Sequence, residues 1–501
     1  MQRLLEPIPG DLKQLPDRSK TRIKALLEAA PDPDEALHFC DRFRREAHEA
    51  FDQVLENPTA LTYALTIFSY SRFLSEAVIR HPDWLLDLTS SGEMHRVLSA
   101  EEYEERLNAF LGEGVPAPIE LARFRRQQVL RLVLRDVLAL GSLSDVTEEL
   151  SNLADSILDV CYQRIHHELA LVHGMPQLDG AEARFSVISL GKLGGKELNY
   201  SSDIDLMFIY SGNGETTGEK RITNKEFFKK VANRYTELLS TYSAEGMCYR
   251  VDLRLRPDGR YGEVCQSLEG AKTYYTGRAR DWELQMLIKA RVSAGDRDLG
   301  RELLEYVEPL TYSTTLDFKA VESVSETRER ISEKLKRSHQ AGLDIKLTRG
   351  GIRDIEFLVQ CLQRLHGGRE PWVRHGGTQF ALFRLRDKDL LSDSEYARLS
   401  SAYQFLRNLE HRLQFYEDRQ THTLPEDIER LDVLAHKMPT GVRGGISSAG
   451  SLERELNENL EAVQELYERV IHSRRPMYYT ISEPSSFDLE TATEIERPEL
   501  A

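Results

Sequence analysis

The segment from Phe185 to Tyr210 constrains the fold of this chain more than any other. Its first six residues, Phe-Ser-Val-Ile-Ser-Leu, form a short apolar run of the kind that favours a strand, and a glycine-rich loop follows. Residues 203–210, Asp-Ile-Asp-Leu-Met-Phe-Ile-Tyr, predict a second strand that ends at the turn Gly212-Asn-Gly. Two strands joined through a glycine bend predict a small sheet with a loop at its edge.

The next residues extend this unit. Residues 223–244 place apolar side chains on one helical stripe and predict a helix. Residues 247–256 alternate between apolar and polar side chains and predict a third strand. Its polar face carries Arg250, Asp252, Arg254 and Arg256. Strand, strand, helix and strand together predict a compact α/β unit.

Helical periodicity dominates the rest of the chain. We therefore predict an α+β fold that is mostly helical, with the small mixed-sheet domain between an N-terminal helical region and a C-terminal helical bundle. The long C-terminal helices are expected at 318–340, 351–365, 394–418 and 451–474, with a glycine-rich link near 440. The predicted domains are 1–150 (helical region), 151–310 (α/β unit), 311–475 (bundle) and 476–501 (flexible tail).

Charge and cysteine usage narrow the class of protein. Lys and Arg number 66 against 82 Asp and Glu, a formal charge of −16, which disfavours nucleic acid as a partner. The five cysteines are scattered and never spaced as Cys-x-x-Cys, which argues against disulfides and structural zinc. The first residues lack an apolar signal core, and the longest apolar stretch, 129–140, is broken by charges. We expect a cytoplasmic protein that does not enter a membrane.

The two aspartates of the second strand carry the chemistry. Side chains two residues apart on a strand point to the same face, so Asp203 and Asp205 project together, with backbones about 6–7 Å apart. Paired carboxylates suit Mg²⁺, a hard ion that takes oxygen ligands and also binds phosphates. Asp252, on the polar face of the third strand, can supply a third carboxylate as a metal ligand or a base. A lone Asp-x-Asp is usually the end of a strand exposed to water. Its combination with a glycine loop and a third aspartate favours a catalytic metal site.

Other residues are candidates for phosphate or nucleotide binding. Glycines at 191, 194 and 195 let backbone N–H groups approach phosphate oxygens. Two known phosphate motifs do not fit: the loop is too short for a P-loop and lacks its Ser or Thr, and no Gly-x-Gly-x-x-Gly follows a strand. A solvated polar face or a structural ion pair explains the charged candidates equally well. The full set is Gly191, Lys192, Gly194, Gly195, Ser202, Arg250, Arg254, Lys289, Arg353 and Glu356.

Several blocks of sequence resemble a known family. The loop and Asp-x-Asp strand are similar to the nucleotidyltransferase superfamily, and more closely to the bifunctional glutamine synthetase adenylyltransferase/adenylyl-removing enzyme family. The resemblance extends over about residues 60–430. It includes four further blocks, in the family's order: Arg80-His-Pro-Asp-Trp-Leu, Arg250-Val-Asp-Leu-Arg-Leu-Arg-Pro, Gly350-Gly-Ile-Arg-Asp-Ile-Glu-Phe-Leu-Val-Gln and Gln420-Thr-His-Thr-Leu-Pro.

The resemblance implies a function and leaves its direction open. Members of the family usually carry two catalytic units, one that adds AMP to a glutamine synthetase tyrosine and one that removes it. This chain has a single unit, and its Glu197-Leu-Asn-Tyr-Ser-Ser-Asp-Ile-Asp block looks more like the removing half. Phosphorolysis of adenylylated glutamine synthetase to ADP is therefore expected. ATP-dependent adenylylation, uridylyl transfer to a signal protein and a non-catalytic regulatory module are the alternatives.

The same resemblance implies the partners. Glutamine synthetase is the expected protein substrate, with ATP, ADP and phosphate as small ligands, Mg²⁺ as the cofactor and a PII-type signal protein as a further partner. Asp203, Asp205 and Asp252 would be both the catalytic residues and the metal ligands.

Overall fold

The computed structural model describes residues 12, 15–312, 342–439 and 446–472. Within these ranges the chain is mostly helical around one five-stranded sheet, which confirms the predicted α+β class. No helix in the same ranges is both long and apolar enough to cross a membrane. The predicted helix 318–340, the link near 440 and the tail 476–501 lie outside the described residues.

Helices fill the chain from residue 17 to residue 173. Prolines 33, 58 and 118 occupy the first turn of their helices, where the missing N–H removes no hydrogen bond. The longest helix runs from residue 143 to 173 and packs along the sheet. The helices are α1 (Asp17–Glu28), α2 (Pro33–Glu46), α3 (His48–Glu56), α4 (Pro58–Tyr70), α5 (Arg72–Arg80), α6 (Asp83–Ser90), η3 (Glu93–His95), α7 (Ala100–Phe110), α8 (Pro118–Val137) and α9 (Leu143–His173).

The sheet has the strand order β5-β4-β3-β7, with β6 also paired to β4. β3 is antiparallel to β4 and β7, whereas β5 and β6 run parallel to β4 along the same edge. A separate two-stranded ribbon joins β1 (Gln177–Leu178) and β2 (Ala181–Glu182). The sheet strands are β3 (Phe185–Leu190), β4 (Ile204–Tyr210), β5 (Val251–Asp252), β6 (Cys265–Ser267) and β7 (Arg291–Gly295).

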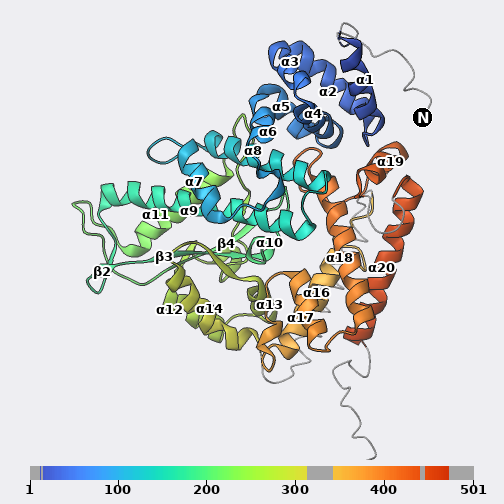
Figure 1. Cartoon of the computed structure of the whole chain (residues 1–501). Coiled ribbons are helices and arrows are strands. Elements are labelled where there is room, and N and C mark those ends of the chain that lie inside the picture. The colour runs from blue at the N-terminus through green and yellow to red at the C-terminus, as the bar shows by residue number, and fades with distance from the viewer. Residues whose placement is uncertain (1–11, 13–14, 313–341, 440–445, 473–501) are drawn as a thin grey trace, which may run out of the picture.

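Helices cover both faces of this sheet (Figure 1). α9 and α11 (Asn224–Ser240) lie on one face, and α12 (Leu268–Gly277) and α14 (Arg297–Thr311) lie on the other. Alternate residues of β4 divide between the two layers: Leu206 and Phe208 join the core under α9 and α11, while Met207 and Ile209 join the core over α12 and α14. Asp205 has the parity of Met207 and therefore projects on the α12–α14 side.

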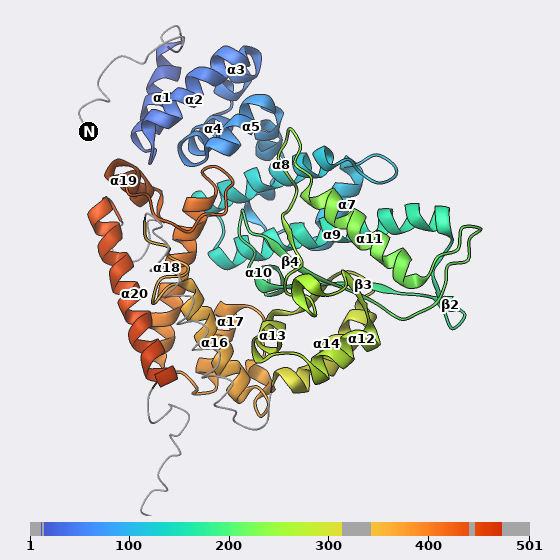
Figure 2. The same cartoon turned by 180° about the vertical axis from the view of Figure 1, so that it is seen from behind.

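The C-terminal part forms a bundle with its own core, seen beside the sheet unit in Figure 2. Its predicted helices at 351–365, 394–418 and 451–474 are present with slightly different ends. The bundle elements are α16 (Ile352–His366), η6 (Pro371–Val373), α17 (Thr378–Asp387), α18 (Asp393–Gln414), α19 (Ile428–Lys437) and α20 (Ala449–His472).

Buried polar contacts attach the bundle to the loop that connects β3 and β4. Arg407 of α18 donates hydrogen bonds to the Glu197 carbonyl oxygen at 2.8 Å and to Asn199 Oδ1 at 2.6 Å. The Glu197 carboxylate accepts hydrogen bonds from the backbone N–H groups of Thr378 and Gln379 at the start of α17. A carboxylate there also interacts favourably with the positive end of the helix dipole. The bundle is thus fixed to the loop that carries the candidate site.

The predicted domain limits stay predictions, but two of them can be compared with the core. The limit near residue 150 falls inside α9, and one continuous core joins the N-terminal helices to the sheet. The bundle has a separate core made of residues from Ile345 to Tyr467.

Candidate active site

The sheet brings the three predicted aspartates together. Asp205 of β4 is the register partner of Asp252 in the parallel strand β5, and neighbouring strands lie about 4.8 Å apart. Asp203 precedes β4 by one residue and shares the parity of Asp205. All three side chains line one cavity of about 740 Å³.

The third strand is shorter than predicted, which corrects the range 247–256. β5 contains only Val251 and Asp252, which pair with Ile204 and Asp205, and β6 pairs with the same edge of β4 from Phe208 onward. Beyond β5 the chain turns, so the expected common face of four polar residues does not form. Arg256 in particular donates to three backbone carbonyl oxygens and does not line the cavity.

Gly191 is shaped to the Asp205 carboxylate. Its φ of +57° lies in the left-handed region that favours glycine, and a Cβ at this position would lie 2.4 Å from Asp205 Oδ2. Gly191 also lines the cavity, in the short helix α10 (Gly191–Gly194). Only glycine lets the loop and the carboxylate approach this closely.

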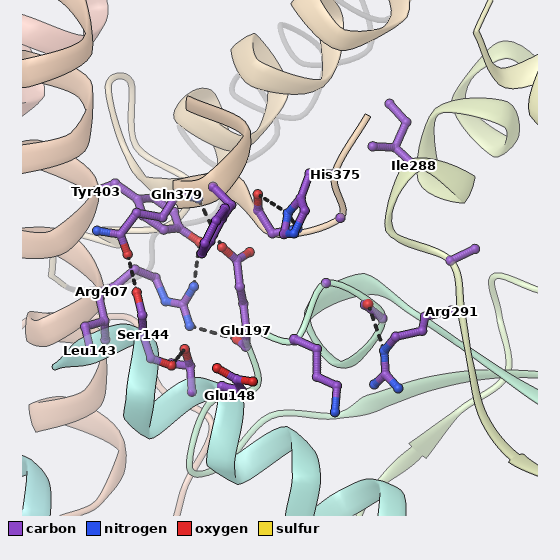
Figure 3. Close-up of a pocket in the computed structure, with 18 residues that line it drawn as sticks. Leu143, Ser144, Glu148, Glu197, Ile288, Arg291, His375, Gln379, Tyr403 and Arg407 are labelled. Atoms are coloured by element: carbon purple, nitrogen blue, oxygen red, sulfur yellow. Dashed lines mark hydrogen bonds between the residues drawn. The ribbon is translucent and has the colours of Figure 1, made fainter. Parts of the chain in front are cut away.

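Gly194 and Gly195 lie elsewhere. A Cβ on Gly194 would meet the carbonyl oxygen of Lys289 at 1.9 Å, and one on Gly195 would meet that of Gly376 at 2.7 Å. Both glycines line a second cavity of about 350 Å³, on the α9 side of the loop. Ser144 of α9 and Gln379 of α17 are joined across it by a 2.8 Å hydrogen bond, as Figure 3 shows. Close backbone packing therefore accounts for these two glycines.

Burial and like charge act on Asp205. Desolvation first, and then the charges of Asp252 and Asp203, raise the pKa of its carboxyl to about 7. No hydrogen bond or ion pair to its side chain is formed within the described ranges. Burial also acts on Asp252, but its hydrogen bonds from Arg254 outweigh that effect and lower its pKa. The site thus contains one carboxyl without a counter-charge next to two that have one.

Two arginines supply those counter-charges. Arg250 Nε lies 2.5 Å from Asp203 Oδ1, and Arg254 Nε lies 2.7 Å from Asp252 Oδ2. In this arrangement no group of three acidic, histidine or cysteine side chains among the described residues is set to hold a metal ion. The donors themselves fit Mg²⁺, because all are carboxylate oxygens and Asp205 lacks a cation partner.

Two predicted charged residues neutralise each other. Lys289, in η5 (Leu287–Lys289), has its Nζ 3.1 Å from Glu197 Oε2 and 3.4 Å from Glu356 Oε1. Burial of Glu356 opposes ionisation, but the charges of Lys289 and Lys192 lower its pKa to about 2. Both line the cavity while forming an ion pair of the structural kind.

Lys192 is less exposed than a loop lysine in water. Burial lowers its pKa to about 8, and the carboxylate of Glu410, 3.5 Å away, opposes that effect. The ammonium group faces the cavity from the glycine loop and is partly compensated.

The bundle supplies a basic wall that sequence reasoning found only in part. Both Arg353, which was predicted, and Lys346, which was not, line the cavity. Neither side chain forms an ion pair within the described ranges. Lys346 lies in a turn in which Asp344 Oδ1 accepts hydrogen bonds from the backbone N–H groups of Lys346 and Leu347, and no local motif marks it. Predicted Ser202 lines the cavity as well, while Arg250 contacts Asp203 from outside it. Further lining residues that were not predicted are Leu255, Trp282, Gln285, Met286, Leu347, Asp354, Phe357, Gln420 and His422.

Two family models match different parts of the chain. Residues 61–306 match the family model of glutamate-ammonia ligase adenylyltransferase, and residues 322–471 match that of the PII-uridylyltransferase. The first range holds the sheet and its aspartates, and the second holds the bundle.

Similar curated proteins carry the name bifunctional glutamine synthetase adenylyltransferase/adenylyl-removing enzyme. One from Nitrosococcus oceani is 38% identical over 90% of this chain and 46% of its own length. Others from Thioalkalivibrio sulfidiphilus and Pseudomonas putida are 36% and 37% identical, over 81% and 84% of this chain and 41% and 42% of their own lengths. The chain spans less than half the length of these relatives. With both family models and these relatives covering most of its sequence, the chain belongs to the glutamine synthetase adenylyltransferase family.

Proposed function

We propose that this chain is a metal-dependent nucleotidyltransferase that removes AMP from a modified tyrosine of glutamine synthetase, with phosphate as the attacking group and ADP as the product. The observation that carries the proposal is the cluster of Asp203, Asp205 and Asp252 beside Gly191, in a cavity large enough for a nucleotide. The names of the relatives support glutamine synthetase as the protein substrate. A PII-type signal protein is proposed as a regulator on the match to the PII-uridylyltransferase model.

Opposite walls of the cavity would hold different parts of the ligand. Mg²⁺, held by Asp203, Asp205 and Asp252, would supply charge neutralisation at the reacting phosphoryl group. Lys346 and Arg353 have no carboxylate partner within the described ranges, so their charge is available to phosphate oxygens. The adenine ring would find apolar and aromatic side chains in Leu255, Trp282, Met286, Leu347 and Phe357.

The reaction balances without a further reagent. An oxygen of hydrogen phosphate forms a bond to the phosphorus of the tyrosyl-AMP group, and the bond from that phosphorus to the tyrosine oxygen breaks. The proton of hydrogen phosphate ends on the tyrosine, so the products are ADP and the free phenol. A phenol with a pKa of about 10 is an adequate leaving group. The chain's own contribution is to position and to stabilise charge.

Phosphate and ATP, supplied separately, test both activity and direction. Wild type, Asp205→Asn and the exposed control Asp298→Asn are incubated with Mg²⁺ and adenylylated glutamine synthetase, and ADP release and protein mass are recorded. We expect ADP and a mass loss of one AMP with wild type and Asp298→Asn, and at least a hundredfold slower release with Asp205→Asn. No release by wild type, or equal release by all three, would exclude this function.

ATP-dependent adenylylation is the second candidate, because the matched family model bears that activity in its name. It predicts pyrophosphate release and a mass gain when unmodified glutamine synthetase and ATP are supplied. Replacing ATP with UTP tests uridylyl transfer in the same assay. Binding of nucleotide without turnover in any arm would favour a non-catalytic regulatory module.

A further inference from the structure

Hydrogen bonds from one arginine side chain fix the backbone of the loop that follows Asp252. Arg256 donates hydrogen bonds to the carbonyl oxygens of Leu253, Glu263 and Gly262 at 2.8, 3.0 and 3.1 Å. A Cβ on Gly262 would lie 2.0 Å from the Pro257 carbonyl oxygen, so the backbone closes tightly on itself. We name residues 253–263 the clasped loop. Such internal bonding leaves little conformational entropy for a partner to remove on binding.

The clasped loop joins the candidate active site to the outside of the molecule. At its base the Arg254 N–H donates to Asp252 Oδ1 at 2.8 Å. At its tip, in η4 (Gly259–Tyr261), the side chains of Arg260 and Tyr261 are exposed, and Tyr261 is 99% exposed. A single exposed tyrosine is common on protein surfaces. Tyr261, however, lies on a loop that is fixed by internal hydrogen bonds and that begins next to Asp252. Exposure of a single tyrosine does not explain such a loop.

Arginines at 260, 278 and 280 belong to this tip or to the segment joined to it, although the whole chain is acidic. Arg278 pairs with Asp258 of the loop at 2.7 Å, so the end of α12 is joined to it. The side chains of Arg260 and Arg280 are exposed and form no ion pair within the described ranges. Trp282, 40% exposed, extends the surface into the cavity. Exposed Tyr, Trp and Arg are the side chains that contribute most to protein interfaces.

We propose that the clasped loop docks the protein substrate, and that it recognises an acidic segment next to the tyrosine that is modified. The inference rests on the proposed function and adds the surface that selects the substrate. Arg260 and Arg280 would attract and orient carboxylates of that segment, while Tyr261 would pack against its apolar side chains. Arg256 is the positioning residue that keeps the tip in place.

Two substitutions at the tip, each with a matched control, test the proposal in the full chain. Tyr261→Ala is compared with Tyr242→Ala, an exposed tyrosine in the turn beside Glu245, which pairs with Arg126 of the N-terminal helices. Arg260→Glu is compared with Arg45→Glu on α2. KM and kcat for adenylylated glutamine synthetase are measured at low and high salt, and ADP binding is measured by calorimetry.

We expect Tyr261→Ala and Arg260→Glu to raise KM at least tenfold, with kcat and ADP affinity of Tyr261→Ala within twofold of wild type and both controls unchanged. KM of wild type should rise with salt, and that dependence should weaken in Arg260→Glu because screening then has less attraction to remove. An unchanged KM in both tip variants, or an equal loss of ADP affinity, would overturn the proposal.

A separate binding measurement distinguishes docking from turnover. Adenylylated glutamine synthetase is passed over the immobilised chain without phosphate. Binding by wild type that Tyr261→Ala weakens, together with absent turnover, would contradict the proposed function and support the docking surface. Turnover by wild type, together with tip variants that bind adenylylated glutamine synthetase as well as wild type does, would support the proposed function and contradict the docking surface.

Discussion

Replacement of Asp205 by Asn should make the metal-free protein more stable, by an amount that depends on pH. Burial and two neighbouring carboxylates raise the pKa of Asp205 from 3.8 to about 7. The unfolded chain loses this proton near pH 3.8 and the folded chain keeps it to about pH 7. Between these values the unfolded state binds fewer protons, so the free energy of unfolding of wild type falls as pH rises.

One pKa unit corresponds to about 1.4 kcal/mol, so the full cost of ionising Asp205 in the folded chain is about 4 kcal/mol. Asn resembles the protonated carboxyl and avoids this cost. The gain in stability should therefore be about 1.5 kcal/mol at pH 5, where only part of the interval has been crossed, and about 4 kcal/mol at pH 8. Active sites commonly sacrifice stability in this way.

Urea unfolding of wild type and Asp205→Asn, with a chelator present at pH 5, 6, 7 and 8, measures this difference. Asp298→Asn is the control, because the Asp298 side chain is exposed on α14, does not line the cavity and should bring no gain when it is replaced. A stability difference for Asp205→Asn that is the same at pH 5 and pH 8 would refute the reasoning, since it would mean that Asp205 ionises alike in both states.

Three further outcomes follow from the same site. Gly191→Ala should lower kcat/KM at least about a hundredfold with the fold retained, since a Cβ would lie 2.4 Å from Asp205 Oδ2. A circular dichroism spectrum unlike that of wild type would contradict this expectation. Lys289→Met should destabilise the protein by about 3–5 kcal/mol in chemical unfolding, because Glu197 and Glu356 would remain buried without the ammonium group of Lys289. An effect below about 1 kcal/mol would refute this expectation. Mn²⁺ affinity, measured by calorimetry, should fall up to about tenfold for each pH unit below 7, as Asp205 takes up a proton; a constant affinity from pH 5.5 to 8 would be the contrary result.

The sequence predicted those parts of the site that depend on local pattern. β3 and β4 were located to within one residue, because short apolar runs on both sides of a glycine loop leave few other structures. The grouping of Asp203 and Asp205 followed from the two-residue repeat of a strand. Arg353 and Glu356 were among the candidates and both line the cavity, because helical spacing separates them from the buried stripe of α16.

Features set by distant contacts could not be predicted. The alternation after Asp252 continues to Leu255, but β6 takes the edge of β4 that a longer β5 would need. The Gly194-Gly195 pair is typical of a phosphate-binding loop, yet the close neighbours of these glycines are the carbonyl oxygens of Lys289 and Gly376. Lys346 stands in no motif and reaches the cavity only through the packing of the bundle.

The bundle contributes to the candidate active site because the charges that line the cavity are divided between two walls. Asp203, Asp205 and Asp252 come from the edge of the sheet, whereas the basic side chains without partners, Lys346 and Arg353, come from the bundle. A phosphate group bridged to the carboxylates through a cation would still carry negative charge on its far side, and among the described residues that line the cavity the cations without an ion pair, Lys346 and Arg353, belong to the bundle. The contacts of Arg407 and Glu197 keep the two walls at a fixed separation. The sheet unit alone would therefore retain the acidic cluster and lose the means to hold the nucleotide against it.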